Sequence, residues 1–198
     1  MSSRIFDAKQ PYVAMGAYVD ANALLIGDVE VGEDSSVWPM AVLRGDVHSV
    51  RIGNRTNIQD GCVLHVTHAG PHNKNGRMLT IGDEVTIGHN ATLHGCTIKD
   101  RCLIGMGAIV MDGAVIESDV IVAAGSLVPE NKVLKSGFVY MGSPAQEERP
   151  ITQEEKDFIK YSASQYIVLK NHYLTEIQAK IARERMEARE RDKDRERV

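Results

Sequence analysis

The stretch that decides the fold runs from Asn57 to Gly105 and reads NIQDGCVLHVTHAGPHNKNGRMLTIGDEVTIGHNATLHGCTIKDRCLIG. Aliphatic residues recur in it every six positions, as in Ile81, Ile87 and Leu93. A six-residue period is typical of a parallel β-helix, in which each hexad supplies one inward aliphatic side chain and a turn. Three hexads close one triangular coil, and such a coil buries its core only when others stack on it.

The same period extends outward from this stretch in both directions, from Val19 to Val128. Extra residues interrupt it in two places, around 46–49 and within 67–78. The second insertion contains Gly, Pro and Asn, so it predicts an excursion loop. The sequence therefore predicts a mainly β chain whose residues 1–150 form a hexapeptide-repeat β-helix.

A helical pattern follows the repeats. Thr152 and Glu155 have the spacing of a capping box. Apolar residues then recur at helical spacing, beginning with Ile159 and Ala163. We expect an amphipathic C-terminal helix over 151–182 that packs on the β-helix, and a charged tail over 183–198 that is frayed or disordered.

Composition narrows the class of protein. The net charge is −4, and the charges of the tail nearly cancel, so we expect no nucleic-acid partner. The N-terminus lacks the pattern of a signal peptide, and no apolar run is long enough to span a membrane. Three cysteines without a CxxC pair indicate a reducing compartment. These features predict a soluble, cytoplasmic protein with no membrane partner.

Two histidines should lie one above the other on one face of the β-helix. His65 follows Leu64 and His94 follows Leu93, and these leucines are one coil apart once the inserted loop is removed. Arg44 falls in the same column, meaning the positions directly above one another in successive coils. Stacked strands are ~4.8 Å apart. Both imidazoles could therefore bind one ion at ~2.0–2.1 Å.

A third histidine falls on the preceding face. His89 lies above Asp60, with Gln59 adjacent, so it should not reach the ion of His65 and His94 within one chain. If three β-helices pack about a three-fold axis, His89 of a neighbour would complete the site. Three protein ligands leave a fourth position for water, which is the pattern of catalytic zinc. Histidines with an ordinary surface or stacking role are the alternative.

The segments WPMAVLRGDVHSVRIGNRTNIQDGCVLHVTH (38–68) and TIGHNATLHGCTI (86–98) resemble the γ-class carbonic anhydrase family, most closely its YrdA-like branch. The resemblance implies a left-handed parallel β-helix and a homotrimer with metal sites at its interfaces. It implies that His65 and His94 of one chain and His89 of the next hold Zn²⁺, with Fe²⁺ or Co²⁺ possible. The implied reaction is reversible hydration of CO₂ to bicarbonate by hydroxide formed from metal-bound water.

The same resemblance implies roles for several polar residues. Gln59 and Asp60 would orient the bound water, and Asn57 would help to position that network. Arg44 and Asp46 would pair across the subunit boundary and hold the trimer. A purely structural salt bridge is the alternative for Arg44 and Asp46, and interface hydrogen bonding is the alternative for Gln59 and Asp60.

The sequence departs from the family pattern at two places that concern proton transfer. Val47 stands where well-studied members have a glutamate, and the loop 67–78 contains no carboxylate. The loop offers His68 and His72, whose ordinary pKa suits a proton relay. The alternative is that these two residues are ordinary solvent-exposed histidines without a role in proton transfer. Because the glutamates are missing, the carbonic anhydrase activity is expected to be low.

Two other classes of function stay open. The coils and the Gly-Ser-Pro-Ala segment (142–145) are shared with hexapeptide acyltransferases and related CoA-thioester hydrolases. Those enzymes generally use one histidine as a base and do not need three that converge. A non-catalytic trimeric metal-binding module, with the helix and tail as its working surface, is the third reading.

Overall fold

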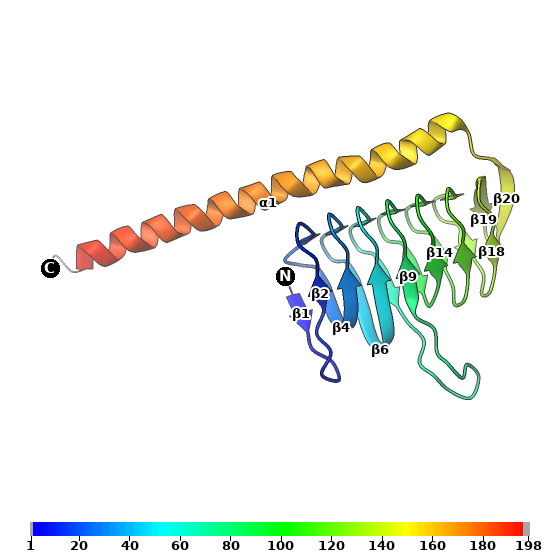
Figure 1. Cartoon of the computed structure of the whole chain (residues 1–198), viewed down its shortest axis with the longest axis horizontal. Coiled ribbons are helices and arrows are strands. Elements are labelled where there is room, and N and C mark those ends of the chain that lie inside the picture. Colours follow the sequence, from blue (N-terminus) through cyan, green and yellow to red (C-terminus); the bar gives the residue numbers. More distant parts are fainter. Residues whose placement is uncertain (1, 196–198) are drawn as a thin grey trace.

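Short parallel strands stack into a β-helix with three faces, and one long helix lies alongside it (Figure 1). The computed structural model describes residues 2–195, with the side chains of 3–188. The strands end at Pro150 and the helix begins at Gln153. This architecture confirms the predicted parallel β-helix with a long C-terminal helix.

The first face is an eight-stranded sheet. All its strands are parallel except the last, which forms a hairpin with the one before it. In spatial order they are β3 (Tyr18–Val19), β5 (Ser36–Val37), β7 (Asn57–Ile58), β10 (Thr86–Ile87), β13 (Leu103–Ile104), β16 (Ile121–Val122), β19 (Phe138–Gly142) and β20 (Ala145–Pro150).

The other two faces form one sheet because two long strands, β4 (Leu24–Val31) and β6 (Val42–Ile52), turn the corner between them. β1 (Ser2–Arg4) and β2 (Tyr12–Val13) pair with β4 at the N-terminal end. The second face continues through β8 (Val63–His65), β11 (Thr92–His94), β14 (Ile109–Val110) and β17 (Leu127–Val128). The third continues through β9 (Leu79–Ile81), β12 (Thr97–Ile98), β15 (Val115–Ile116) and β18 (Val133–Leu134).

The corner of β6 carries the residues that the first insertion adds. Gly45 lies against the preceding coil, where a Cβ would come within 2.3 Å of the carbonyl oxygen of Asp28. Only glycine allows the two backbones to approach this closely. The corner therefore fixes Arg44 and Asp46, on either side of Gly45, at the end of the second face.

The interior is a continuous stack of aliphatic side chains, as the six-residue period predicts. Leu43, Leu64 and Leu93 lie in register on the second face and are fully buried. Cys96 is buried in the same core, and burial raises its pKa to about 12. Its thiol therefore stays protonated and acts as a small apolar side chain.

The second insertion forms the predicted excursion loop, which projects away from the coils between β8 and β9 (Figure 1). Two antiparallel bridges, Thr67 with Arg77 and Gly70 with Asn73, hold it as a narrow extension. His68 and His72 are exposed on it.

The helix α1 (Gln153–Arg195) runs along the first face and continues past the N-terminal end of the β-helix (Figure 1). The capping box is confirmed, because Thr152 Oγ1 accepts the N–H of Glu155 and the Glu155 carboxylate accepts the N–H of Thr152. The helix does not end near residue 182 but continues through the charged tail to Arg195. Residues 196–198 of that tail lie outside the described residues. Along residues 2–195, no helix combines the length and apolar character needed to cross a bilayer.

Candidate metal centre

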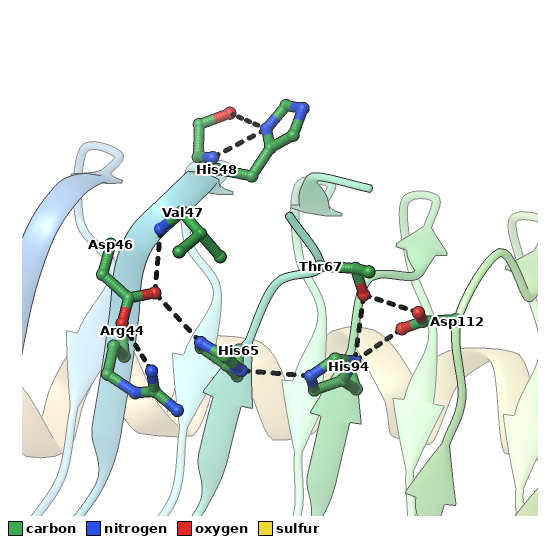
Figure 2. A network of polar contacts seen from close by, with 9 residues as sticks. Arg44, Asp46, Val47, His48, His65, Thr67, His94 and Asp112 are labelled. Carbon is green, nitrogen blue, oxygen red and sulfur yellow. Dashed lines mark hydrogen bonds and ion pairs between the residues drawn. The ribbon is translucent and has the colours of Figure 1, made fainter. Parts of the chain in front are cut away.

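His65 and His94 lie side by side at the ends of β8 and β11 (Figure 2). The strand register pairs the two residues directly, which confirms the predicted column. Nδ1 of His65 is 3.0 Å from Nε2 of His94. Both side chains are partly exposed, so an ion could reach these two nitrogens from the outside of the second face.

A carboxylate holds the other nitrogen of each ring (Figure 2). Nε2 of His65 lies 3.0 Å from Oδ1 of Asp46, and Nδ1 of His94 lies 2.5 Å from Oδ1 of Asp112. A carboxylate accepts a hydrogen bond from the N–H of the imidazole nitrogen that it contacts, and this keeps a proton on that nitrogen of each ring. The two nitrogens that face each other are then left with lone pairs.

Asp46 is anchored by three donors. Arg44 Nη1, His65 Nε2 and the backbone N–H of Val47 all donate to it. Burial raises the pKa of Asp46. The hydrogen bonds together lower it by more than burial raises it, so the pKa of Asp46 is below its ordinary value. Arg44 and Asp46 thus pair within one chain, and their pairing across a subunit boundary stays a prediction.

Burial lowers the pKa of His65 below its usual value, and the charge of Arg44 acts in the same direction. The hydrogen bond to Asp46 raises this pKa, but by less than the sum of the opposing effects. His65 is therefore a neutral imidazole at pH 7, which is the form that binds metal ions.

Sequence reasoning missed Asp112 and Thr67. Thr67 Oγ1 donates a hydrogen bond to Oδ2 of Asp112. Burial raises the pKa of Asp112, but the hydrogen bonds from Thr67 and His94 lower it by more, so the pKa of Asp112 is below its ordinary value. The coil length points only to a neighbouring position, because the register pairs Leu93 with Val110, 17 residues on, and so places Asp112 one residue beyond the column of His94. The corner that brings it back toward His94 is not encoded in the aliphatic period.

His89 belongs to a separate polar network at the edge of the first face. Its Nδ1 lies 3.0 Å from Oδ2 of Asp60, and its backbone N–H donates to Oε1 of Gln59. Gln59 donates to Asn57, which in turn donates to Thr86 Oγ1. The His89 and Asp60 side chains are 40% and 48% exposed, so both can contact a neighbouring molecule.

The structure thus joins the predicted residues into two groups: His65, His94, Arg44 and Asp46 on the second face, and His89, Asp60, Gln59 and Asn57 beside the first. In the part of one chain that the structure describes, no three His, Cys, Asp or Glu side chains gather closely enough to hold a metal ion. His68 and His72 stay apart from both groups on the exposed loop.

An apolar groove lies next to the His89 network, between the first face and the start of α1. Its volume is about 350 Å³. Gln59, Thr86 and Ser162 provide its polar groups, and Met106, Ile121 and Phe158 are among its apolar walls. Ser162 and Thr86 are themselves hydrogen-bonded, which ties the helix to this edge of the sheet.

Comparison with known proteins supports the repeat pattern. The family described as "Bacterial transferase hexapeptide (six repeats)" matches residues 95–130, and "Hexapeptide repeat of succinyl-transferase" matches residues 78–111. Among solved structures, a hexapeptide transferase family protein from Anaplasma phagocytophilum is 41% identical with a TM-score of 0.79, covering 86% of this chain and 96% of that one.

Several relatives share most of the sequence. Protein YrdA of Escherichia coli (strain K12) is 51% identical over 164 residues, which cover 83% of this chain and 89% of that protein. Gamma carbonic anhydrase 2, mitochondrial, of Arabidopsis thaliana is 44% identical over 87% of this chain and 61% of its own length. A probable carbonic anhydrase of Methanocaldococcus jannaschii is 40% identical, covering 79% and 94%. With the hexad β-helix and the placement of the three histidines, these relatives show that the chain belongs to the γ-class carbonic anhydrase family, in its YrdA-like branch.

Proposed function

We propose that the chain is a zinc-dependent enzyme that catalyses the reversible hydration of CO₂ to bicarbonate in the cytoplasm. In this proposal the active form is a homotrimer. His65 and His94 of one protomer and His89 of the next hold Zn²⁺, and Fe²⁺ or Co²⁺ could replace it. Relatives named as gamma carbonic anhydrases support the reaction class.

The observation that carries the proposal is the contact between the two imidazoles. Nδ1 of His65 and Nε2 of His94 are 3.0 Å apart, while the other nitrogen of each ring is held by a carboxylate. With a proton on each nitrogen that faces a carboxylate, the two facing nitrogens turn lone pairs toward each other, which is repulsive unless a proton or a metal ion lies between them. Two nitrogens bound to a tetrahedral zinc ion are about 3.3 Å apart, so a small displacement of the rings would accommodate it.

The exposed position of His89 supports a shared site. Nδ1 of its ring lies 3.0 Å from Asp60, which leaves Nε2 free to bind a metal held by another protomer. Carboxylate-bound histidines are typical of metal centres, because the carboxylate fixes the ring and makes it a better ligand. All three proposed ligands have such a partner: Asp46, Asp112 and Asp60.

The surrounding residues would handle the substrate and the proton. When bound, Zn²⁺ would lower the pKa of a coordinated water to about 7 and so supply the nucleophile at neutral pH. Asp60 would accept a hydrogen bond from that water, Gln59 would form a hydrogen bond with it, and Asn57 holds Gln59 in place. His68 and His72, on the exposed loop, would pass the released proton to solvent.

Mixed trimers test the shared site. His89→Ala keeps His65 and His94, whereas His94→Ala keeps His89, so each variant alone should bind no zinc at an interface. When the two are unfolded and refolded together, each mixed trimer regains one interface with all three histidines. We expect zinc content and CO₂ hydration, measured by stopped flow, to reappear only in the mixture. Zinc retention by His89→Ala alone, or no recovery on mixing, would contradict the proposal.

A hexapeptide acyltransferase is a second candidate, which the apolar groove beside Gln59 and the similarity to a hexapeptide transferase family protein favour. Calorimetric binding of acetyl-CoA that persists after chelation of metal would support it. Its absence, together with CO₂ hydration that is lost on chelation, would exclude it.

A further inference from the structure

We propose that Asp112, held by Thr67, is a positioning residue that keeps the proton of His94 on Nδ1 and so reserves Nε2 for a metal ion. This inference rests on the proposed function. It assigns a role to two residues outside the three-histidine motif.

The geometry gives Asp112 two contacts at the site. Its Oδ1 lies 2.5 Å from Nδ1 of His94, and its Oδ2 accepts a hydrogen bond of 2.5 Å from Thr67 Oγ1. Thr67 is two residues beyond His65, so the carboxylate bridges the strand of His94 and the strand segment that follows His65. A carboxylate held at both oxygens cannot rotate away from the imidazole, and this fixes the plane of the ring.

The backbone beside His94 makes room for this carboxylate. Gly95 follows His94 directly, and a Cβ on it would lie 2.6 Å from Oδ1 of Asp112. Gly95 also has a φ of +49°, a conformation that glycine adopts at little cost. Any larger residue at this position would displace Asp112 from His94.

The two halves of the site are built alike. Asp46 holds His65 from the preceding coil, and Asp112 holds His94 from the following coil (Figure 2). The two carboxylates lie on opposite sides of the pair of rings. Nδ1 of His65 and Nε2 of His94, which contact neither carboxylate, therefore point toward each other. Removing Asp112 would let His94 take the Nε2–H tautomer, which has no lone pair on Nε2 for a metal ion beside His65.

The variant Asp112→Ala tests this role through two measurements. The first is zinc affinity, measured by competition with a chromophoric chelator, and we expect a 10- to 100-fold loss. The second is the tautomer of His94 in metal-free protein, read from long-range ¹⁵N–¹H correlation spectra, and we expect the proton to move from Nδ1 to Nε2. Asp119→Ala is the matched control, because Asp119 is also a partly buried corner carboxylate but pairs with Arg101.

Thr67 provides a second pair of variants that should not disturb folding. Thr67→Val keeps the shape but loses the hydroxyl, which donates to Asp112 and also lies 3.4 Å from Nδ1 of His94. We expect a loss of zinc affinity of about fivefold, dominated by the shorter hydrogen bond to Asp112. Thr67→Ser keeps the hydroxyl and should bind zinc as the wild type does. Equal affinities for Val and Ser variants, or a wild-type His94 that carries its proton on Nε2, would overturn the inference. If wild-type protein bound no zinc, the proposed function would fail, whereas the tautomer measurement would still decide the role of Asp112.

Discussion

The ammonium group of Lys170 lies 2.8 Å from Oδ1 of Asp34, although Lys170 is only 1% exposed. Lys170 lies on α1 and Asp34 in the turn between β4 and β5, so this ion pair ties the helix to the first coils. Nζ of Lys170 also donates to Oδ1 of Asn171. The helix is therefore fixed by a buried charge whose main partner is supplied by the β-helix.

This arrangement predicts unequal effects of removing the two partners. Asp34→Asn leaves a buried ammonium without its counter-ion, and we expect it to lower the free energy of unfolding by about 1–3 kcal/mol. The exposure of Asp34 keeps the loss below that of a fully buried pair. Asparagine suits the position because Asp34 has a φ of 55°.

Lys170→Met removes the charge itself and keeps an unbranched side chain, so we expect a change below about 1 kcal/mol. Urea unfolding of both variants and of the double variant measures these values. The double variant should match Lys170→Met alone. A loss for Lys170→Met as large as that for Asp34→Asn would show that the pair itself stabilises the helix.

An aromatic cluster next to this ion pair predicts a spectroscopic effect. Trp38, the single tryptophan of the chain, is buried against Tyr18, Tyr166 and Tyr173, with ring centroids 5.2–5.5 Å apart. We expect Tyr173→Ala to expose the indole and shift its emission to longer wavelength. Tyr161→Ala is the control, because Tyr161 lies on the same helix but is 58% exposed. An unchanged spectrum for Tyr173→Ala would mean that Tyr173 does not shield the indole from water.

The sequence allowed the column of His65 and His94 to be predicted, because a strict period fixes both the spacing and the direction of each side chain. Asp112 was missed because it lies at a corner one residue beyond the column of His94, since Leu93 pairs with Val110 only 17 residues on. The helix was expected to end at residue 182 but continues to Arg195. The expectation relied on the apolar stripe, which the charged tail lacks, and a helix can continue without such a stripe. Whether His89 meets the ion depends on a neighbouring chain, which no periodicity within one chain can reveal.

The start of α1 predicts a dependence of stability on pH. The hydrogen bond from Arg149, with that from the backbone N–H of Thr152, lowers the pKa of Glu155 to about 2. A carboxylate whose pKa is lower in the folded than in the unfolded state stabilises the fold above its unfolded pKa of about 4.3. That contribution is lost as the pH falls from about 4.3 toward 2.

We expect Glu155→Gln to be less stable than the wild type at pH 7 by up to about 1 kcal/mol, because glutamine still accepts the N–H of Thr152 but loses the charged pairing with Arg149. The difference should shrink as the pH is lowered through that range, in urea unfolding at constant ionic strength. Glu154→Gln is the control, because Glu154 is in the same first turn but outside the capping box. A difference that is constant from pH 7 to pH 2.5 would assign the effect to packing.

Zinc itself should stabilise the folded protein. A ligand that binds only the folded state at a free concentration 1,000 times its Kd adds about 4 kcal/mol to the free energy of unfolding. We therefore expect the melting temperature to rise with added Zn²⁺ and to fall again on chelation. His94→Ala should abolish the rise, since it removes one of two nitrogens that converge within a chain. His172→Ala, a histidine on α1 away from β8 and β11, should keep it. An equal rise in both variants would place the bound zinc elsewhere on the surface, because only the first substitution changes the paired imidazoles.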